Sequence, residues 1–288
     1  MFWTVLQDFF SIALELTLLF IGISFLISLI QGFIPYHKIQ KFLQEKNKGL
    51  GILAALLLAF ITPFCSCSTI PVVVNLLNKK IPFGIVMVFL FSSPVLDPTI
   101  ITLMGAMLGV KVAVAYTIIT SILSVAIGLI LERLGFEKHV KKVVMSGYQE
   151  KETKFSLKGA FLDTVDLMKS VYPYLLIGAA IGSVIHGYVP EEWIASVFGG
   201  DNWWLVPVAA IIGIPLYIRL STMIPLSQIL VAKGMAMAPV MALMISSAGA
   251  SLPEITLLNS IFRKKLVIAF IVSVISMATL SGFLFYFI

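Results

Sequence analysis

Long apolar runs separated by short polar stretches dominate the hydrophobic pattern of the chain. In the first half they cover residues 9–34, 49–78, 82–108 and 110–132. A run of about twenty apolar residues can cross the hydrocarbon core of a bilayer as an α-helix. The pattern therefore predicts an all-α integral membrane protein that crosses the bilayer several times.

The composition supports this prediction and narrows the function. Of the 288 residues, 59% are hydrophobic and 12% are charged, whereas a soluble domain carries about 25% charged residues. The net charge of +6 comes from Lys and Arg in a few loops, which is typical of membrane topology rather than nucleic-acid binding. Two cysteines cannot supply the four ligands of a structural zinc site. We expect the lipid bilayer as a partner, with no nucleic acid, no cofactor, no resident metal and no enzymatic activity; association between copies of the chain is left open.

The two halves of the chain are similar when one is shifted by 154 residues. The shift places Ser-Thr-Ile-Pro (68–71) over Thr-Met-Ile-Pro (222–225), and the serine pair at 92–93 over the pair at 246–247. Agreement at separated places indicates a tandem duplication. We expect a first membrane repeat at 1–135, a basic linker at 136–156 and a second membrane repeat at 157–288.

Loop charges predict that the two repeats have opposite orientations. The loop at 35–48 carries four lysines, and the linker is also basic, whereas the counterpart of that loop, 190–203, is acidic. Cytoplasmic loops are enriched in Lys and Arg. The linker is therefore expected to be cytoplasmic, the repeats to be inverted, and both chain termini to lie outside.

An inverted repeat requires an odd number of crossings in each half. Residues 49–62 would form a helix of about 21 Å, which is too short to cross. We therefore expect 49–78 and its counterpart 205–232 to be re-entrant hairpins. About eight membrane segments follow, comprising six full crossings and two hairpins. The alternative is one kinked full-length helix and a topology that breaks the charge rule.

Four interruptions rich in Ser, Thr, Pro and Gly fall inside the apolar runs, at 63–71, 92–99, 215–225 and 246–254. Irregular backbone at membrane depth is tolerated where it is buried in protein or lines a polar cavity, and such breaks form the substrate sites of inverted-repeat transporters. The prolines that mark the breaks are Pro63, Pro71, Pro94, Pro98, Pro215, Pro225 and Pro253. The candidate substrate-binding residues are the polar side chains there: Cys65, Ser66, Cys67, Ser68, Thr69, Ser92, Ser93, Arg219, Ser221, Thr222, Ser246 and Ser247.

The cysteine pair and its counterpart predict an asymmetric site. In an extended segment Cys65 and Cys67 point to the same side, and paired thiols suit a soft, thiophilic solute. The alternatives are simple packing and a strained disulfide. Arg219 aligns with Cys65 in the repeat; it can bind an anion, pair with a carboxylate, or lie at a hairpin end with its charge at the membrane surface.

Two isolated carboxylates, Asp97 and Glu254, lie beside prolines at equivalent breaks. Each can carry a coupling proton, because burial raises the pKa of a carboxyl group. Each can equally cap the half helix that follows it. The chain lacks the G-x-x-x-x-G-K-[ST] nucleotide-binding motif, so a proton gradient is the expected energy source.

The runs TPFCSCSTIP (62–71), SSPVLDP (92–98) and STMIPL (221–226) resemble the predicted permeases that include the organoarsenical efflux permease, the ArsP-like permeases. The likeness covers essentially the whole chain. It implies an inner-membrane permease that exports a small thiophilic or anionic solute such as a trivalent organoarsenical, with Cys65 and Cys67 as contacts. The alternatives are a membrane thiol-disulfide oxidoreductase that uses this pair, and a channel-like subunit of a larger complex.

Overall fold

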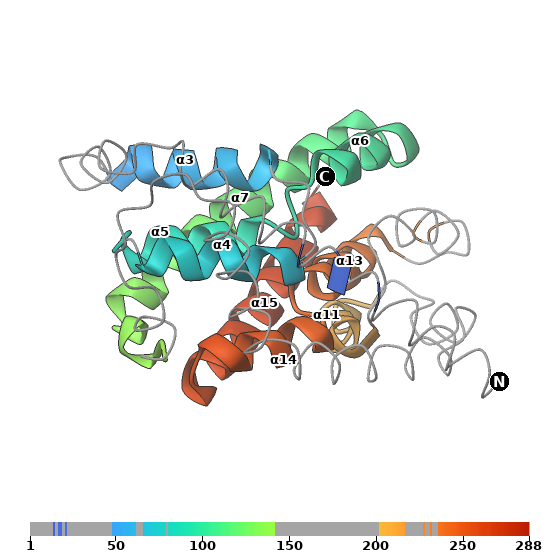
Figure 1. The fold of residues 1–288 in the computed structure, drawn as a ribbon. Coiled ribbons are helices and arrows are strands. Elements are labelled where there is room, and N and C mark those ends of the chain that lie inside the picture. Colours follow the sequence, from blue (N-terminus) through green and yellow to red (C-terminus); the bar gives the residue numbers. More distant parts are fainter. Residues whose placement is uncertain are drawn as a thin grey trace.

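The computed structural model describes residues 48–61, 66–78, 80–141, 202–216 and 236–287, with isolated positions at 14, 17, 18, 21, 227 and 231. These residues form helices, and the extended pairing among them is limited to one bridge between Val140 and Phe262. The all-α class is thus confirmed for the described part (Figure 1). In chain order the helices are α3 (Lys48–Ile61), α4 (Ser66–Asn78), α5 (Phe83–Ser92), α6 (Pro98–Met107), α7 (Val110–Arg133), α11 (Leu205–Leu216), α13 (Met237–Gly249), α14 (Leu252–Ile261) and α15 (Lys264–Leu284), with 3₁₀ helices η1 (Phe136–His139) and η2 (Phe285–Phe287).

Two of the described helices are long and apolar enough to cross a membrane. They are Val110–Arg133 and Lys264–Phe287, each of 24 residues with a mean hydropathy of 2.3. A helix of this length measures about 36 Å, enough for the hydrocarbon core. The described pair α13 and α14, bent by 44°, makes a third crossing if it is counted as one span. Outward-facing side chains such as Ile122 and Ile268, both more than 60% exposed, are suited to lipid contact.

The long helices α7 and α15 run antiparallel. Near their middles, the Ser124 hydroxyl donates a hydrogen bond to the Met277 sulfur at 3.7 Å. Just before α15 begins, the Arg263 N–H donates to the His139 carbonyl, beyond the end of α7, at 2.8 Å. At the other end, Phe285 packs in the same apolar cluster as Tyr116, which lies near the start of α7. Each helix therefore begins where the other ends.

Helix positions recur at the spacing found in the sequence. The helices α13, α14 and α15 begin 154 residues after α5, α6 and α7, respectively. Close packing recurs as well. Gly128 of α7 lies against Val88 and the Gly84 carbonyl of α5, and Gly282 of α15 lies against the corresponding positions of α13, Ala242 and Ala238. No side chain larger than hydrogen fits at either crossing without a shift of backbone.

The segment from α3 to α5 starts and finishes beside the same residue of α7. Lys48, the first residue of α3, forms an ion pair with Glu132 at 3.7 Å. Gly84, near the start of α5, lies against the same Glu132 side chain. Between them, α4 ends in a Schellman motif with Lys80 in the left-handed conformation (φ 57°), and the Ile81 N–H donates to the Leu76 carbonyl at 3.2 Å. The chain thus leaves this end of α7 along α3 and returns to it along α4.

The turn between α14 and α15 lies at this same end. Val140 forms a bridge with Phe262, and the Lys141 N–H donates to the Ile261 carbonyl at 3.0 Å. We call this the basic end, because it holds all but one of the described Lys and Arg residues; the exception, Lys111, is in the first turn of α7. The residues of the basic end are Lys48, Lys80, Arg133, Lys138, Lys141, Arg263, Lys264 and Lys265.

Candidate solute site at the helix breaks

The first described break separates α5 from α6 and consists of residues 93–97. Ser92 and Ser93 are fully buried at the end of α5, and their hydroxyl groups have no hydrogen-bond partner in the described structure. Pro94 lies in the turn that follows, and Pro98 is the first residue of α6. Proline is suited to this first helical position because the N–H that it lacks would have no helical acceptor. The structure thus confirms that a helix begins at Pro98.

The second described break, between α13 and α14, is shorter than the sequence predicts. Ser246 and Ser247 lie inside α13, which continues to Gly249, so the break comprises residues 250 and 251. The two serine hydroxyls donate to the carbonyls of Leu243 and Met244, each at 3.1 Å. Serine is tolerated in a helix when its hydroxyl bonds back to the preceding turn. Serine density alone therefore overestimated the length of this break.

Both breaks lie near the middle of a long helix. Gly249, at the end of α13, packs against Val274, which is close to the midpoint of α15. In the first half, Gly105 of α6 packs against Ala113 of α7. These two helices form an antiparallel pair, so Asp97, eight residues before Gly105, lies about level with residue 121, the middle of α7. Both breaks therefore lie about level with the middle of a long apolar helix.

The two carboxylates differ in position. Ser251 is the N-cap of α14, and its hydroxyl accepts a hydrogen bond from the Glu254 N–H at 3.4 Å. Pro253 lies between them, in the second position of the helix. Glu254 is fully buried, in the first turn of this half helix. Asp97, which is partly buried, precedes Pro98 and is 154 residues before Ser251. Asp97 thus corresponds to Ser251, the N-cap residue of α14, whereas Glu254 lies three residues beyond that cap.

The interruption expected at 63–71 is also narrower than predicted. Helix α4 begins at Ser66, so Ser66, Cys67, Ser68, Thr69 and Pro71 lie in a helix rather than in an extended segment. Pro71 is its sixth residue, and proline has no N–H, so the helical bond to the Cys67 carbonyl cannot form. Thr69 is fully buried. Pro71 therefore removes one hydrogen bond from α4 without ending the helix, contrary to the expected break.

Helix α4 also forms a contact between the first and second halves of the chain. It packs on α14, and both helices end at the basic end, so their N-terminal residues point into the protein together.

Pro215 lies inside α11, one residue before its end. Several candidates fall outside the described residues: Pro63, Cys65, Arg219, Ser221, Thr222 and Pro225. The expected pairing of thiols with a guanidinium group stays a prediction.

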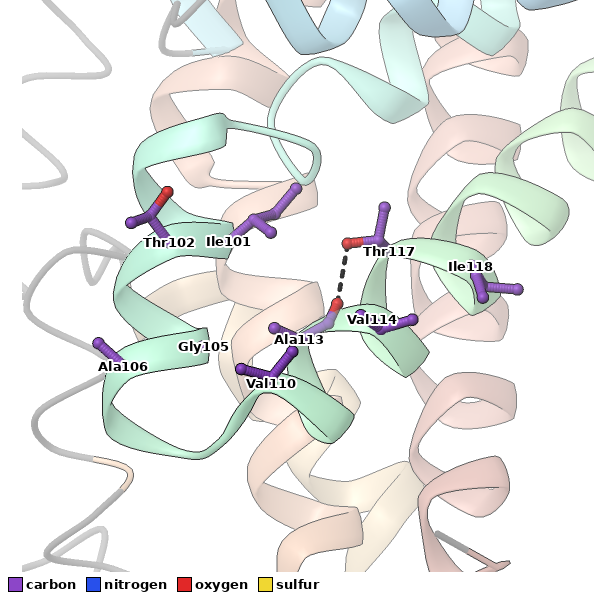
Figure 2. A pocket seen from close by; sticks show the side chains of 9 residues that line it. All are labelled: Ile101, Thr102, Gly105, Ala106, Val110, Ala113, Val114, Thr117 and Ile118. Carbon is purple, nitrogen blue, oxygen red and sulfur yellow. Dashed lines mark hydrogen bonds between the residues drawn. The ribbon is translucent and has the colours of Figure 1, made fainter.

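An apolar groove of about 540 Å³ lies between α6 and α7, as Figure 2 shows. Its two hydroxyl groups bond to their own helices: Thr102 donates to the Pro98 carbonyl at 2.7 Å, and Thr117 to the Ala113 carbonyl at 2.8 Å. The remaining lining is aliphatic side chains and Gly105. This groove therefore offers no polar group to a solute and is better suited to lipid.

Tyr116 is a buried polar residue that the sequence analysis missed. It is fully buried in α7, and its hydroxyl has no hydrogen-bond partner in the described structure. Its counterpart 154 residues later is Phe270, which stacks on Phe91 with ring centroids 5.0 Å apart. In an apolar helix a tyrosine follows the same periodicity as a phenylalanine. In the sequence, Tyr116 stands out only when the two halves are aligned, because it carries a hydroxyl group that its counterpart Phe270 lacks.

Comparison with known proteins identifies the family. A family model described as predicted permease matches residues 2–287. A UPF0718 protein of Methanocaldococcus jannaschii is 22% identical over 76% of this chain and 77% of its own. A Streptococcus mutans protein, named as a subunit of a two-component membrane permease complex, is 23% identical over 85% of this chain and 83% of its own. No solved structure matches the chain. The chain belongs to the ArsP-like family of predicted permeases and is a multi-pass membrane protein.

Proposed function

We propose that this protein is a secondary transporter, not an enzyme, that exports a small thiophilic or anionic solute, such as a trivalent organoarsenical, across the inner membrane. The observation that carries the proposal is the position of the two helix breaks. Each falls level with the middle of a long membrane helix, where irregular backbone is expected to line a solute site.

The arrangement of the long helices supports an inverted repeat, with halves 1–135 and 157–288 joined by the linker 136–156. Helices α7 and α15 occupy equivalent places in the sequence yet run antiparallel. The proposed cytoplasmic side is the basic end, as the positive-inside rule requires. The chain returns to Glu132 after α3 and α4, which supports a re-entrant hairpin over a kinked full-length helix. Both termini then lie outside.

The chemistry of the solute is proposed from the first hairpin. Cys67 lies in the first turn of α4, with Cys65 shortly before it, and thiols favour soft species such as trivalent arsenic. Arg219 is proposed to contribute from the second hairpin. For coupling, Glu254 is the stronger candidate for a proton carrier. It is fully buried and is not the capping residue of its helix, so its carboxyl group is not needed to cap α14.

The test is uptake of methylarsenite into everted membrane vesicles energised by a proton gradient. Cys65→Ser combined with Cys67→Ser should abolish uptake while the amount of protein in the membrane stays normal. The control is Ser276→Ala, because Ser276 lies on the exposed face of α15 and bonds to its own helix, at the Val272 carbonyl. Normal uptake by the double variant would remove the thiols from the mechanism.

A second candidate function is a subunit of a two-component permease complex. The observation that favours it is the relative in Streptococcus mutans, which is named as such a subunit. The measurement is methylarsenite transport by the purified chain in proteoliposomes, with no other protein present. Transport by the chain alone would rule out a required second component. Transport that needs membranes from the native host would support one.

A further inference from the structure

Burial of the Tyr116 hydroxyl is not explained by packing. The side chain is fully buried in the protein, and its oxygen makes no hydrogen bond in the described structure. A buried hydroxyl that lacks a partner is destabilising. In the second half, Phe270 occupies the equivalent position and packs as a plain aromatic ring on Phe91. A phenylalanine would therefore meet the packing requirement, and the hydroxyl is left without a structural role.

The location of Tyr116 places this hydroxyl at the first break. Val95, in the middle of the break, belongs to the same buried cluster as Tyr116. The register of α6 against α7 places Asp97, at the end of the break, about level with residue 121, little more than one helical turn from Tyr116.

The polar groups at this break share one chemical character. Three buried hydroxyls, on Ser92, Ser93 and Tyr116, have no partner in the described structure, and each can both donate and accept a hydrogen bond. These three hydroxyls suit a solute that itself carries hydroxyl groups, because each can donate a hydrogen bond to it or accept one from it.

We propose that Tyr116 is a solute-binding residue, whose hydroxyl hydrogen-bonds a hydroxyl-bearing solute at the first break. The inference rests on the proposed transport function and narrows its solute class to solutes that carry hydroxyl groups. Phe270, the repeat counterpart, supplies the matched control at an equivalent depth in α15.

The first test does not depend on the identity of the solute. Tyr116→Cys and Phe270→Cys are made separately in the full chain carrying Cys65→Ser and Cys67→Ser. Each is exposed in native membranes to a water-soluble methanethiosulfonate reagent. Tyr116→Cys should react several-fold faster, because a solute site admits water whereas a stacked core position does not. Equal rates, or no reaction at Tyr116→Cys, would overturn the proposal even if the protein transports.

The second test uses transport of arsenous acid, a neutral molecule with three hydroxyls. Tyr116→Phe should raise the concentration for half-maximal transport about three- to tenfold, as loss of one hydrogen bond predicts, with the maximal rate little changed. Its unfolding temperature should stay the same or rise. A fall of several degrees with unchanged transport would assign the hydroxyl a structural role and refute the proposal. If the unsubstituted protein carries neither arsenous acid nor methylarsenite, the transport function proposed above fails, and the labelling rates alone decide on Tyr116.

Discussion

The paired glycines at the helix crossings allow the repeat to be tested by stability. A Cβ atom at Gly128 would lie 2.7 Å from a methyl group of Val88 and 2.9 Å from the Gly84 carbonyl oxygen. At Gly282 it would lie 2.6 Å from Val206 and 2.9 Å from the Ala238 carbonyl oxygen. Cβ atoms in real proteins are essentially never this close to another heavy atom. At both glycines one of the close atoms is a backbone carbonyl oxygen, so the helices would have to move apart.

Gly128→Ala and Gly282→Ala should therefore each destabilise the protein by about 1–3 kcal/mol, the usual cost of overpacking. For a chain of this size that corresponds to a fall of about 2–5 °C in the unfolding temperature. The two falls should agree closely, because the two crossings are repeat counterparts. Gly49→Ala is the control: nothing lies within 4 Å of its added Cβ, and alanine favours helix.

The assay is thermal unfolding of the purified variants in one detergent, followed by intrinsic fluorescence. Gly49→Ala should leave the unfolding temperature unchanged or raise it slightly. If Gly128→Ala unfolds at the same temperature as Gly49→Ala, the close approach of α5 and α7 is refuted. If only one of the two crossing variants is destabilised, the equivalence of the two crossings is refuted.

Three further predictions concern the turns and caps. Lys80→Gly should raise stability by about 1 kcal/mol, because a non-glycine residue in the left-handed conformation costs about that much; an unfolding temperature that falls would contradict the Schellman motif seen at this residue. Ser251→Ala should lower stability by about 1 kcal/mol through loss of the N-cap, and Ser251→Asn should restore most of it; equal losses in both variants would argue against a cap. Val140→Cys with Phe262→Cys, in a chain carrying Cys65→Ser and Cys67→Ser, should form a disulfide under mild oxidation, because paired residues of an antiparallel bridge are close enough; Val140→Cys with Val110→Cys, at opposite ends of α7, should not.

Much of the helical framework could be predicted from the sequence because two simple constraints set it. Apolar length predicted the long helix that became α7. The 154-residue shift found in the sequence is also the spacing at which α13, α14 and α15 follow α5, α6 and α7. The interpretation of Asp97 as a cap implied that a helix begins at the proline after it, and Pro98 is the first residue of α6. These features depend on local chemistry and on bilayer thickness, which are both readable from one chain.

The extents of the breaks could not be predicted, because tertiary context decides whether a polar stretch is helical. Ser246 and Ser247 bond back to their own helix, and Pro71 lies inside α4 as its sixth residue. Tyr116 was missed for a different reason: its distinction from Phe270 is a single oxygen atom whose lack of a partner appears only in three dimensions.

The central claim, that the two halves lie in the membrane in opposite orientations, is most directly tested at Lys111 and Lys265. These residues are 154 positions apart, in the first turns of α7 and α15. Each is replaced by cysteine in a chain carrying Cys65→Ser and Cys67→Ser, and intact cells are treated with a membrane-impermeant maleimide. The account predicts that Lys111→Cys is labelled in intact cells, whereas Lys265→Cys is labelled only after the membrane is opened. Labelling of both variants from the same side would contradict it.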